Sequence, residues 1–150
     1  MNTQTNPSIH SLVRIAHNPA VVHLMPATIE TTLRLEGFAV CAMAVFAYAH
    51  AGHSWLMFAL LFLSPDLSII GYLMGSRIGA TIYNLFHSYA GPAALWLAGL
   101  ALGDQVPTAI ALIWFAHIGF DRALGYGLKF ITSFKHTHLG SIGLSRSLEV

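Results

Sequence analysis

Four long apolar stretches dominate the chain and limit the folds open to it. They run roughly over residues 33–50, 54–75, 78–102 and 106–124, and each is close to the ~20 residues with which an α-helix spans a bilayer. Only 9% of the 150 residues are charged, whereas soluble domains carry about 25%. Such a chain cannot cover a soluble core with polar surface. We therefore predict an all-α fold, a four-helix transmembrane bundle.

Short polar breaks separate the four stretches. The segments "HAGHS" (50–54), "MGSRIG" (74–79) and "LGDQVP" (102–107) carry residues typical of turns. Pro65 and Pro92 lie inside the second and third stretches, where a membrane helix tolerates kinks. We predict an N-terminal cytoplasmic or interfacial segment over residues 1–30, a transmembrane domain over 31–130 and a cytoplasmic tail over 131–150.

The basic residues predict the orientation of the bundle. All seven fall before or at the start of the first stretch, between the second and third, or at and after the end of the fourth: Arg14, Arg34, Arg77, Arg122, Lys129, Lys135 and Arg146. The other two loops contain no Lys or Arg. Because basic loops stay in the cytoplasm, both termini are expected inside, in a multi-pass membrane protein. The net charge of +1 gives no reason to expect a nucleic-acid partner.

Six polar residues interrupt the predicted spans, all in the half nearest the basic loops: Glu36, Asp66, Asn84, His87, His117 and Asp121. A carboxylate near a helix centre costs about 2.5–3.5 kcal/mol on insertion scales, so it normally faces the bundle interior and a partner. Asn84 and His87 are three residues apart, and His117 and Asp121 four, so each pair shares one helix face. We expect these groups to converge.

Imidazoles and carboxylates gathered in a dry pocket are the ligands that a divalent metal such as Zn, Fe or Mn uses. We predict Asp66, His87, His117 and Asp121 as its ligands. Glu36 and Arg122 are the predicted catalytic residues, Glu36 as general base and Arg122 as the group that binds an anionic lipid headgroup or a phosphate. The predicted supporting residues around the ligands are Asn84, Tyr72, Tyr83, Lys129 and His138.

Other uses of the same polar residues remain open. A structural ion-pair network, for example between Asp66 and a histidine or Arg122, and a proton or ion pathway both fit an intramembrane cluster. Haem ligation by His87 and His117 is a further alternative, although the neighbouring carboxylates weigh against haem.

Several long motifs resemble one bacterial family, domain of unknown function 4260. They are "LRLEGFAV", "SPDLSIIGYLMGSRIGATIYNLFHSY", "AHIGFDRALGYGLKF" and "FKHTHLG", and the resemblance covers about residues 31–140. It implies a small integral protein of the bacterial inner membrane and brings no established activity with it. The residues by which we identify the family coincide with the polar residues above.

The resulting prediction is a metal-dependent membrane hydrolase that acts on a lipid or amphipathic substrate, with the metal lowering the pKa of a bound water. A redox version with a di-iron centre would lack the paired Glu-x-x-His motifs of di-iron bundles. The alternative class is non-enzymatic: a transporter, a proton path or an accessory subunit. Small residues over 71–80 and 90–103 permit close packing within the bundle or in a homo-oligomer.

Overall fold

The computed structural model describes residues 27–130, 133–137 and 140–141. Its helices are α2 (Ala27–His50), α3 (Trp55–Leu61), the 3₁₀ helix η2 (Ser64–Met74), α4 (Ser76–Phe86), α5 (Ala90–Leu102) and α6 (Gln105–Leu124). Its strands are β1 (Lys129–Phe130), β2 (Ser133–Thr137) and β3 (Gly140–Ser141). Most of the predicted N-terminal segment, 1–30, and His138 lie outside the described residues.

Three of the four predicted spans are long and apolar enough to cross a membrane. They are Thr28–His50, Trp55–Met74 and Ser76–Leu102. The helix α6, the fourth predicted span, is not among those found in the described part of the chain. It buries nine residues, including His117, Asp121 and Arg122, and these polar groups lower its hydropathy. Its crossing of the membrane stays a prediction.

The second and third spans each contain a break. Pro65 cannot donate a backbone hydrogen bond, so the carbonyl of Leu61 accepts instead from the Ser64 hydroxyl at 2.7 Å. The chain then continues as an 11-residue 3₁₀ helix, whereas such helices rarely exceed about four residues. In the third span, α4 ends at Phe86 and α5 starts at Ala90. Pro92 lies in the first turn of α5, so this break falls before it.

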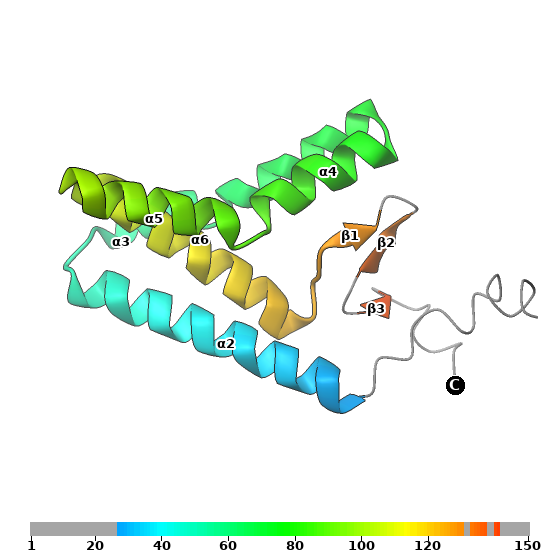
Figure 1. Cartoon of the computed structure of the whole chain (residues 1–150), viewed down its shortest axis with the longest axis horizontal. Coiled ribbons are helices and arrows are strands. Elements are labelled where there is room, and N and C mark those ends of the chain that lie inside the picture. The colour runs from blue at the N-terminus through cyan, green and yellow to red at the C-terminus, as the bar shows by residue number, and fades with distance from the viewer. Residues whose placement is uncertain (1–26, 131–132, 138–139, 142–150) are drawn as a thin grey trace, which may run out of the picture.

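The helix α6 lies between α2 and α5, while η2 and α4 form a hairpin that packs mainly on itself (Figure 1). The helices α2 and α6 approach closely because Gly37 and Gly119 face each other. A Cβ at Gly119 would lie 2.7 Å from the carbonyl oxygen of Gly37. The fold is therefore a helical bundle with α6 at its centre.

The turn between η2 and α4, the start of α2 and the end of α6 all lie at one end of the molecule, with the strands (Figure 1). Arg77 is in the first turn of α4 and Arg122 in the last turn of α6. The loops after His50 and Leu102 lie at the opposite end (Figure 1). The separation of basic and non-basic loops predicted from the sequence is thus present in these described segments.

A small antiparallel sheet in the order β1-β2-β3 follows α6, so the all-α prediction was incomplete. The predicted domain boundary at residue 130 falls inside this sheet. Strands of two to five residues leave too short an alternating pattern to be recognised in the sequence. Asn84 joins the sheet to the bundle: its amide donates to the carbonyl of Lys129 at 2.8 Å and accepts from the Lys129 N–H at 2.7 Å.

Replacing Asn84 with Ala should release β1 from α4. The change removes two hydrogen bonds to a part-buried backbone, at a cost of about 1–3 kcal/mol in unfolding free energy. Hydrogen exchange at the Lys129 amide should accelerate. The control is Ser88→Ala, because the Ser88 hydroxyl makes only a 3.3 Å local bond to Leu85. Equal protection of the Lys129 amide in both variants would show that Asn84 does not hold the strand.

Candidate metal centre

Two histidines and two aspartates from three segments meet at one point. His87 Nε2 lies 3.3 Å from both Asp66 Oδ1 and His117 Nε2, and 3.6 Å from Asp121 Oδ2. His117 Nε2 lies 3.6 Å from Asp66 Oδ1 and 3.8 Å from Asp121 Oδ2. All four atoms fall within 4.8 Å of one another. The four residues predicted as metal ligands are therefore brought together.

These separations match the spacing of ligands around a tetrahedral metal ion. Bonds of about 2.0–2.2 Å from Zn²⁺ to nitrogen and oxygen place ligand atoms roughly 3.3–3.6 Å apart, since the edge of a tetrahedron is about 1.6 times its centre-to-corner distance. The five separations above span 3.3–3.8 Å. All four atoms lie within 4.8 Å of one another, so a tetrahedral ion would require the more widely spaced ligand atoms to move closer together.

Hydrogen bonding fixes the tautomer of His87. Its Nδ1 lies 3.0 Å from the carbonyl oxygen of Tyr83. A carbonyl only accepts, so Nδ1 carries the proton, and the Nε2 of the neutral imidazole then presents a lone pair. That lone pair shares its space with two carboxylate oxygens, which also only accept when ionised. A metal ion between these acceptors, or a proton on His117 Nε2, which lies 3.3 Å from His87 Nε2, would remove this conflict.

The surroundings of the four residues are apolar and aromatic. The Tyr83 ring stacks on the His87 ring with 3.7 Å between their centroids, and its hydroxyl hydrogen-bonds to Asp121. The Phe62 ring packs edge-on against the His117 ring. His117 Nδ1 is buried with no hydrogen bond of good geometry among the described residues, although the Phe62 backbone lies beside it. Tyr83, a predicted supporting residue, thus orients two of the ligands.

Lys129 places a positive charge beside this group. Its side chain is buried, with Nζ 5.2 Å from the centroid of the Tyr83 ring. Burial lowers the pKa of Lys129 below its usual value, while the nearby negative charges of Asp121 and Asp66 act in the opposite direction. Lys129 therefore lies within electrostatic range of both carboxylates; its role as a supporting residue stays a prediction.

The helix breaks explain why these side chains meet. Asp66 follows Pro65 at the start of η2, and His87 stands at the C-terminal end of α4. The two breaks lie opposite each other and against the same face of α6, where His117 and Asp121 are one turn apart. Breaks in membrane helices commonly mark binding sites, because they free polar groups inside the bundle.

Arg122 is buried next to the cluster and contacts backbone. Its Nη2 donates to the carbonyl of His87 at 2.9 Å and its Nη1 to the carbonyl of Tyr126 at 2.7 Å. These bonds join the end of α4 to the end of α6. The guanidinium thus positions the backbone of His87. The sequence analysis predicted that Arg122 binds an anion and did not predict this contact.

Glu36 is not part of the cluster. It lies on an exposed face of α2 and is absent from the group of converging ligand atoms. Tyr72 packs against Gly79, where it joins η2 to α4, and Asn84 binds the strand β1. Of the predicted supporting residues in the described part of the chain, Tyr83 and Lys129 lie closest to the ligands.

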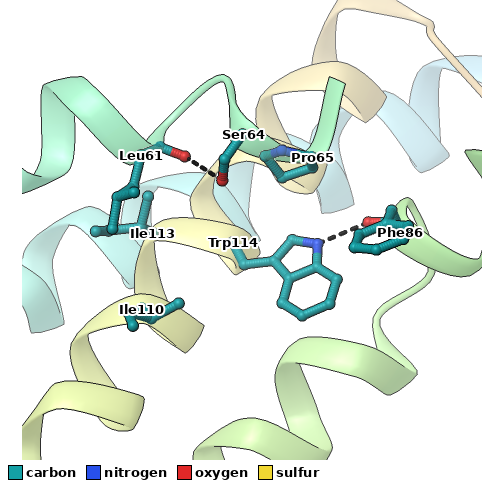
Figure 2. A pocket seen from close by; sticks show the side chains of 7 residues that line it. All are labelled: Leu61, Ser64, Pro65, Phe86, Ile110, Ile113 and Trp114. Carbon is teal, nitrogen blue, oxygen red and sulfur yellow. Dashed lines mark hydrogen bonds between the residues drawn. The ribbon is translucent and has the colours of Figure 1, made fainter. Parts of the chain in front are cut away.

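A cavity of about 220 Å³ is lined in part by the residues that precede Asp66 and His87, and the sequence analysis did not predict it. Figure 2 shows its lining, which comes from the α3–η2 junction, the end of α4 and one face of α6: Leu61, Ser64, Pro65, Phe86, Ile110, Ile113 and Trp114. Pro65 and Phe86 immediately precede the ligands Asp66 and His87. One sequence signal could have predicted this cavity: Ile110, Ile113, Trp114 and His117 follow one another at helical spacing and so share one face of α6.

One protein family matches the chain over residues 30–142, and its description reads "Domain of unknown function (DUF4260)". The match includes all four converging residues. The chain belongs to the DUF4260 family. The resemblance seen in the sequence motifs is thereby confirmed, and the family match brings no activity with it. No curated protein and no solved structure matches the chain.

Proposed function

We propose that this DUF4260 protein is a metal-dependent membrane hydrolase whose ion is held by Asp66, His87, His117 and Asp121. The observation that carries the proposal is the convergence of two imidazole nitrogens and two carboxylate oxygens within 4.8 Å of one another. Without a cation, two ionised carboxylates this close together repel each other. The mixed nitrogen and oxygen donors suit Zn, Fe or Mn.

The burial of the ligands differs in a way that favours catalysis. The side chains of His87 and His117 are 0% and 1% exposed, and that of Asp121 is 13% exposed, whereas 38% of the Asp66 side chain is accessible. A substrate or water can therefore reach the ion from the Asp66 side. A bound metal would supply a water of lowered pKa and polarise the bond to be cleaved. Catalytic metal sites keep a coordination position for water, so with four protein ligands this water would take a fifth position on the exposed Asp66 side.

The membrane and the charges around the site favour an amphipathic, anionic substrate. Three helices are able to cross a bilayer. Within the described part of the chain, Arg34, Arg77, Arg122 and Lys129 lie at the end of the bundle that the positive-inside rule assigns to the cytoplasm. We therefore place both termini inside, in the bacterial inner membrane. Lys129 lies next to the cluster, where its ammonium can hold a phosphate or carboxylate headgroup.

Metal analysis of the purified protein tests this proposal. The wild type should carry about one ion per chain, and Asp66→Asn should lose at least ~10-fold in metal affinity, because an amide is a weaker, uncharged ligand. The matched control is Asp104→Asn. Asp104 caps α6 through the Val106 N–H at 2.9 Å, and Asn caps a helix as well as Asp.

The control should keep full metal content and thermal stability. Wild-type protein that is folded but takes up no Zn, Fe or Mn, even after dialysis against each, would refute the metal site. Equal metal content in wild type and Asp66→Asn would remove Asp66 from the ligand set.

Metal transport is a second candidate, favoured by the two broken spans that meet at the cluster. Transporters build ion sites from such paired interruptions. Proteoliposomes distinguish the two functions. A hydrolase should hold its ion without moving it across the bilayer, whereas a transporter should release the trapped metal in a way that Asp66→Asn abolishes.

A further inference from the structure

The cavity beside the cluster has a lining suited to hydrocarbon. Five of its seven lining residues are aliphatic or aromatic, and Pro65 is apolar as well. Its two polar side-chain groups are both occupied: the Ser64 hydroxyl donates to the carbonyl of Leu61 at 2.7 Å, and Trp114 Nε1 donates to the carbonyl of Phe86 at 2.6 Å (Figure 2). Both carbonyls come from the ends of broken helices. The walls that a ligand would contact are therefore apolar, and the hydrogen-bond donors of Ser64 and Trp114 are already used.

One face of α6 leads from this cavity to the cluster. Ile110, Ile113 and His117 follow one another at helical spacing, and Ile110 lies about 10 Å along the axis from His117 at 1.5 Å per residue. Two other lining residues are next in sequence to proposed ligands: Pro65 precedes Asp66, and Phe86 precedes His87. A molecule in the cavity thus contacts the residues next in sequence to two of the four proposed ligands.

The volume fits a short length of alkyl chain. A methylene group takes up about as much space as a water molecule, ~30 Å³ in the liquid, so 220 Å³ accommodates roughly seven such groups. The bilayer around the helices supplies molecules of this chemistry. Lys129 adds charge complementarity for an anionic head at the cluster.

We infer that the cavity binds the alkyl chain of a single-chain anionic amphiphile, whose head lies at the cluster of Asp66, His87, His117 and Asp121. This inference rests on the proposed function and names its substrate class. The chain extends along α6 past Trp114 and Ile110, away from the basic end of the bundle. The number of methylenes that fit sets the preferred chain length, and Ile110 stands at the far end from the cluster.

Trp114 provides a direct probe of occupancy. The full-length protein with Trp55→Phe and Trp96→Phe leaves Trp114 as its single tryptophan. Titrating a chain-brominated alkyl phosphate, at low mole fraction in lipid nanodiscs, should quench Trp114 saturably. A matched protein that retains only Trp96, which is 40% exposed, should show weak quenching that rises linearly with bromine.

Two substitutions at Ile110 test the specificity. Ile110→Phe should shift the preferred chain to a shorter one, and Ile110→Ala to a longer one, each by at least ~3-fold in relative affinity between C8 and C12 phosphates. A general folding defect cannot move the preference in opposite directions. Val106→Phe is the control, because Val106 is on the same helix, 58% exposed and outside the cavity lining.

Metal content measured on the same samples separates this inference from the proposed function. One ion per chain with linear quenching of Trp114 would overturn the inference and leave the metal site intact. Saturable quenching that weakens at least ~5-fold when the metal is removed supports both. Saturable quenching that is unchanged by metal would overturn the placement of the head at the cluster.

Discussion

Replacing His87 with Gln is expected to reduce bound metal from about one ion per chain to below ~0.1. His87 Nε2 is the atom nearest to the centre of the cluster, within 3.3–3.6 Å of the other three ligand atoms. Loss of even the residues that orient metal ligands costs 10–100-fold in affinity, and loss of this ligand should cost more than ~100-fold. Elemental analysis and a metal-chelator competition assay provide the measurement.

The control for this prediction is His50→Gln. His50 ends α2 in the loop opposite the cluster, so its replacement should leave metal content unchanged. Protein content in the membrane should also be compared, because His87 is fully buried. If His87→Gln folds and still binds one ion with wild-type affinity, the cluster is not a metal site and a shared-proton network must hold it together.

Gly119→Ala should separate α2 from α6 and destabilise the bundle. A Cβ at residue 119 would lie 2.6 Å from the backbone nitrogen of Cys41 and 2.7 Å from the carbonyl of Gly37. Both are backbone atoms, so the helices must move apart. Overpacking of this kind costs about 1–3 kcal/mol, and here we expect ~3 kcal/mol because no flexible side chain can give way. Unfolding in mixed detergent micelles measures the change.

The matched control is Ala42→Val on the exposed face of α2. This substitution adds two methyl groups to α2 on the face that is not packed against α6. The unfolding free energy of the Ala42→Val variant should therefore differ from wild type by less than ~0.5 kcal/mol. Since His117 and Asp121 flank Gly119, the Gly119→Ala variant should also bind metal more weakly. Unchanged stability and unchanged metal affinity would contradict the close approach of the two helices.

The sequence predicted the helical bundle and the convergence of four polar side chains because both depend on strong, local signals. Asp66 and His87 are costly in apolar helices, and that cost makes a shared site the simplest solution. The four converging residues could therefore be named from their depth and spacing, and their role as metal ligands stays a prediction. The break at Pro65 could also be predicted, because proline removes a backbone donor whatever surrounds it.

The remaining features depend on contacts between distant segments. The exposed position of Glu36 follows from how α2 rotates against α6, which the close approach of Gly37 and Gly119 determines. The binding of Asn84 to Lys129 spans 45 residues, and no local pattern predicts it. No local pattern predicts the hydrogen bonds of Arg122 either. Its partners are the carbonyl of His87 at the end of α4 and the carbonyl of Tyr126 in the turn after α6.

The two hydrogen bonds from Arg122 have a consequence for how an ion would enter. They hold the backbone of His87 and the end of α6 in place through protein contacts. The backbone that carries His87 is therefore already ordered, in contrast to small metal domains that fold only when the ion arrives. Ion capture then costs little reordering, and a stripped protein should accept a new ion without refolding.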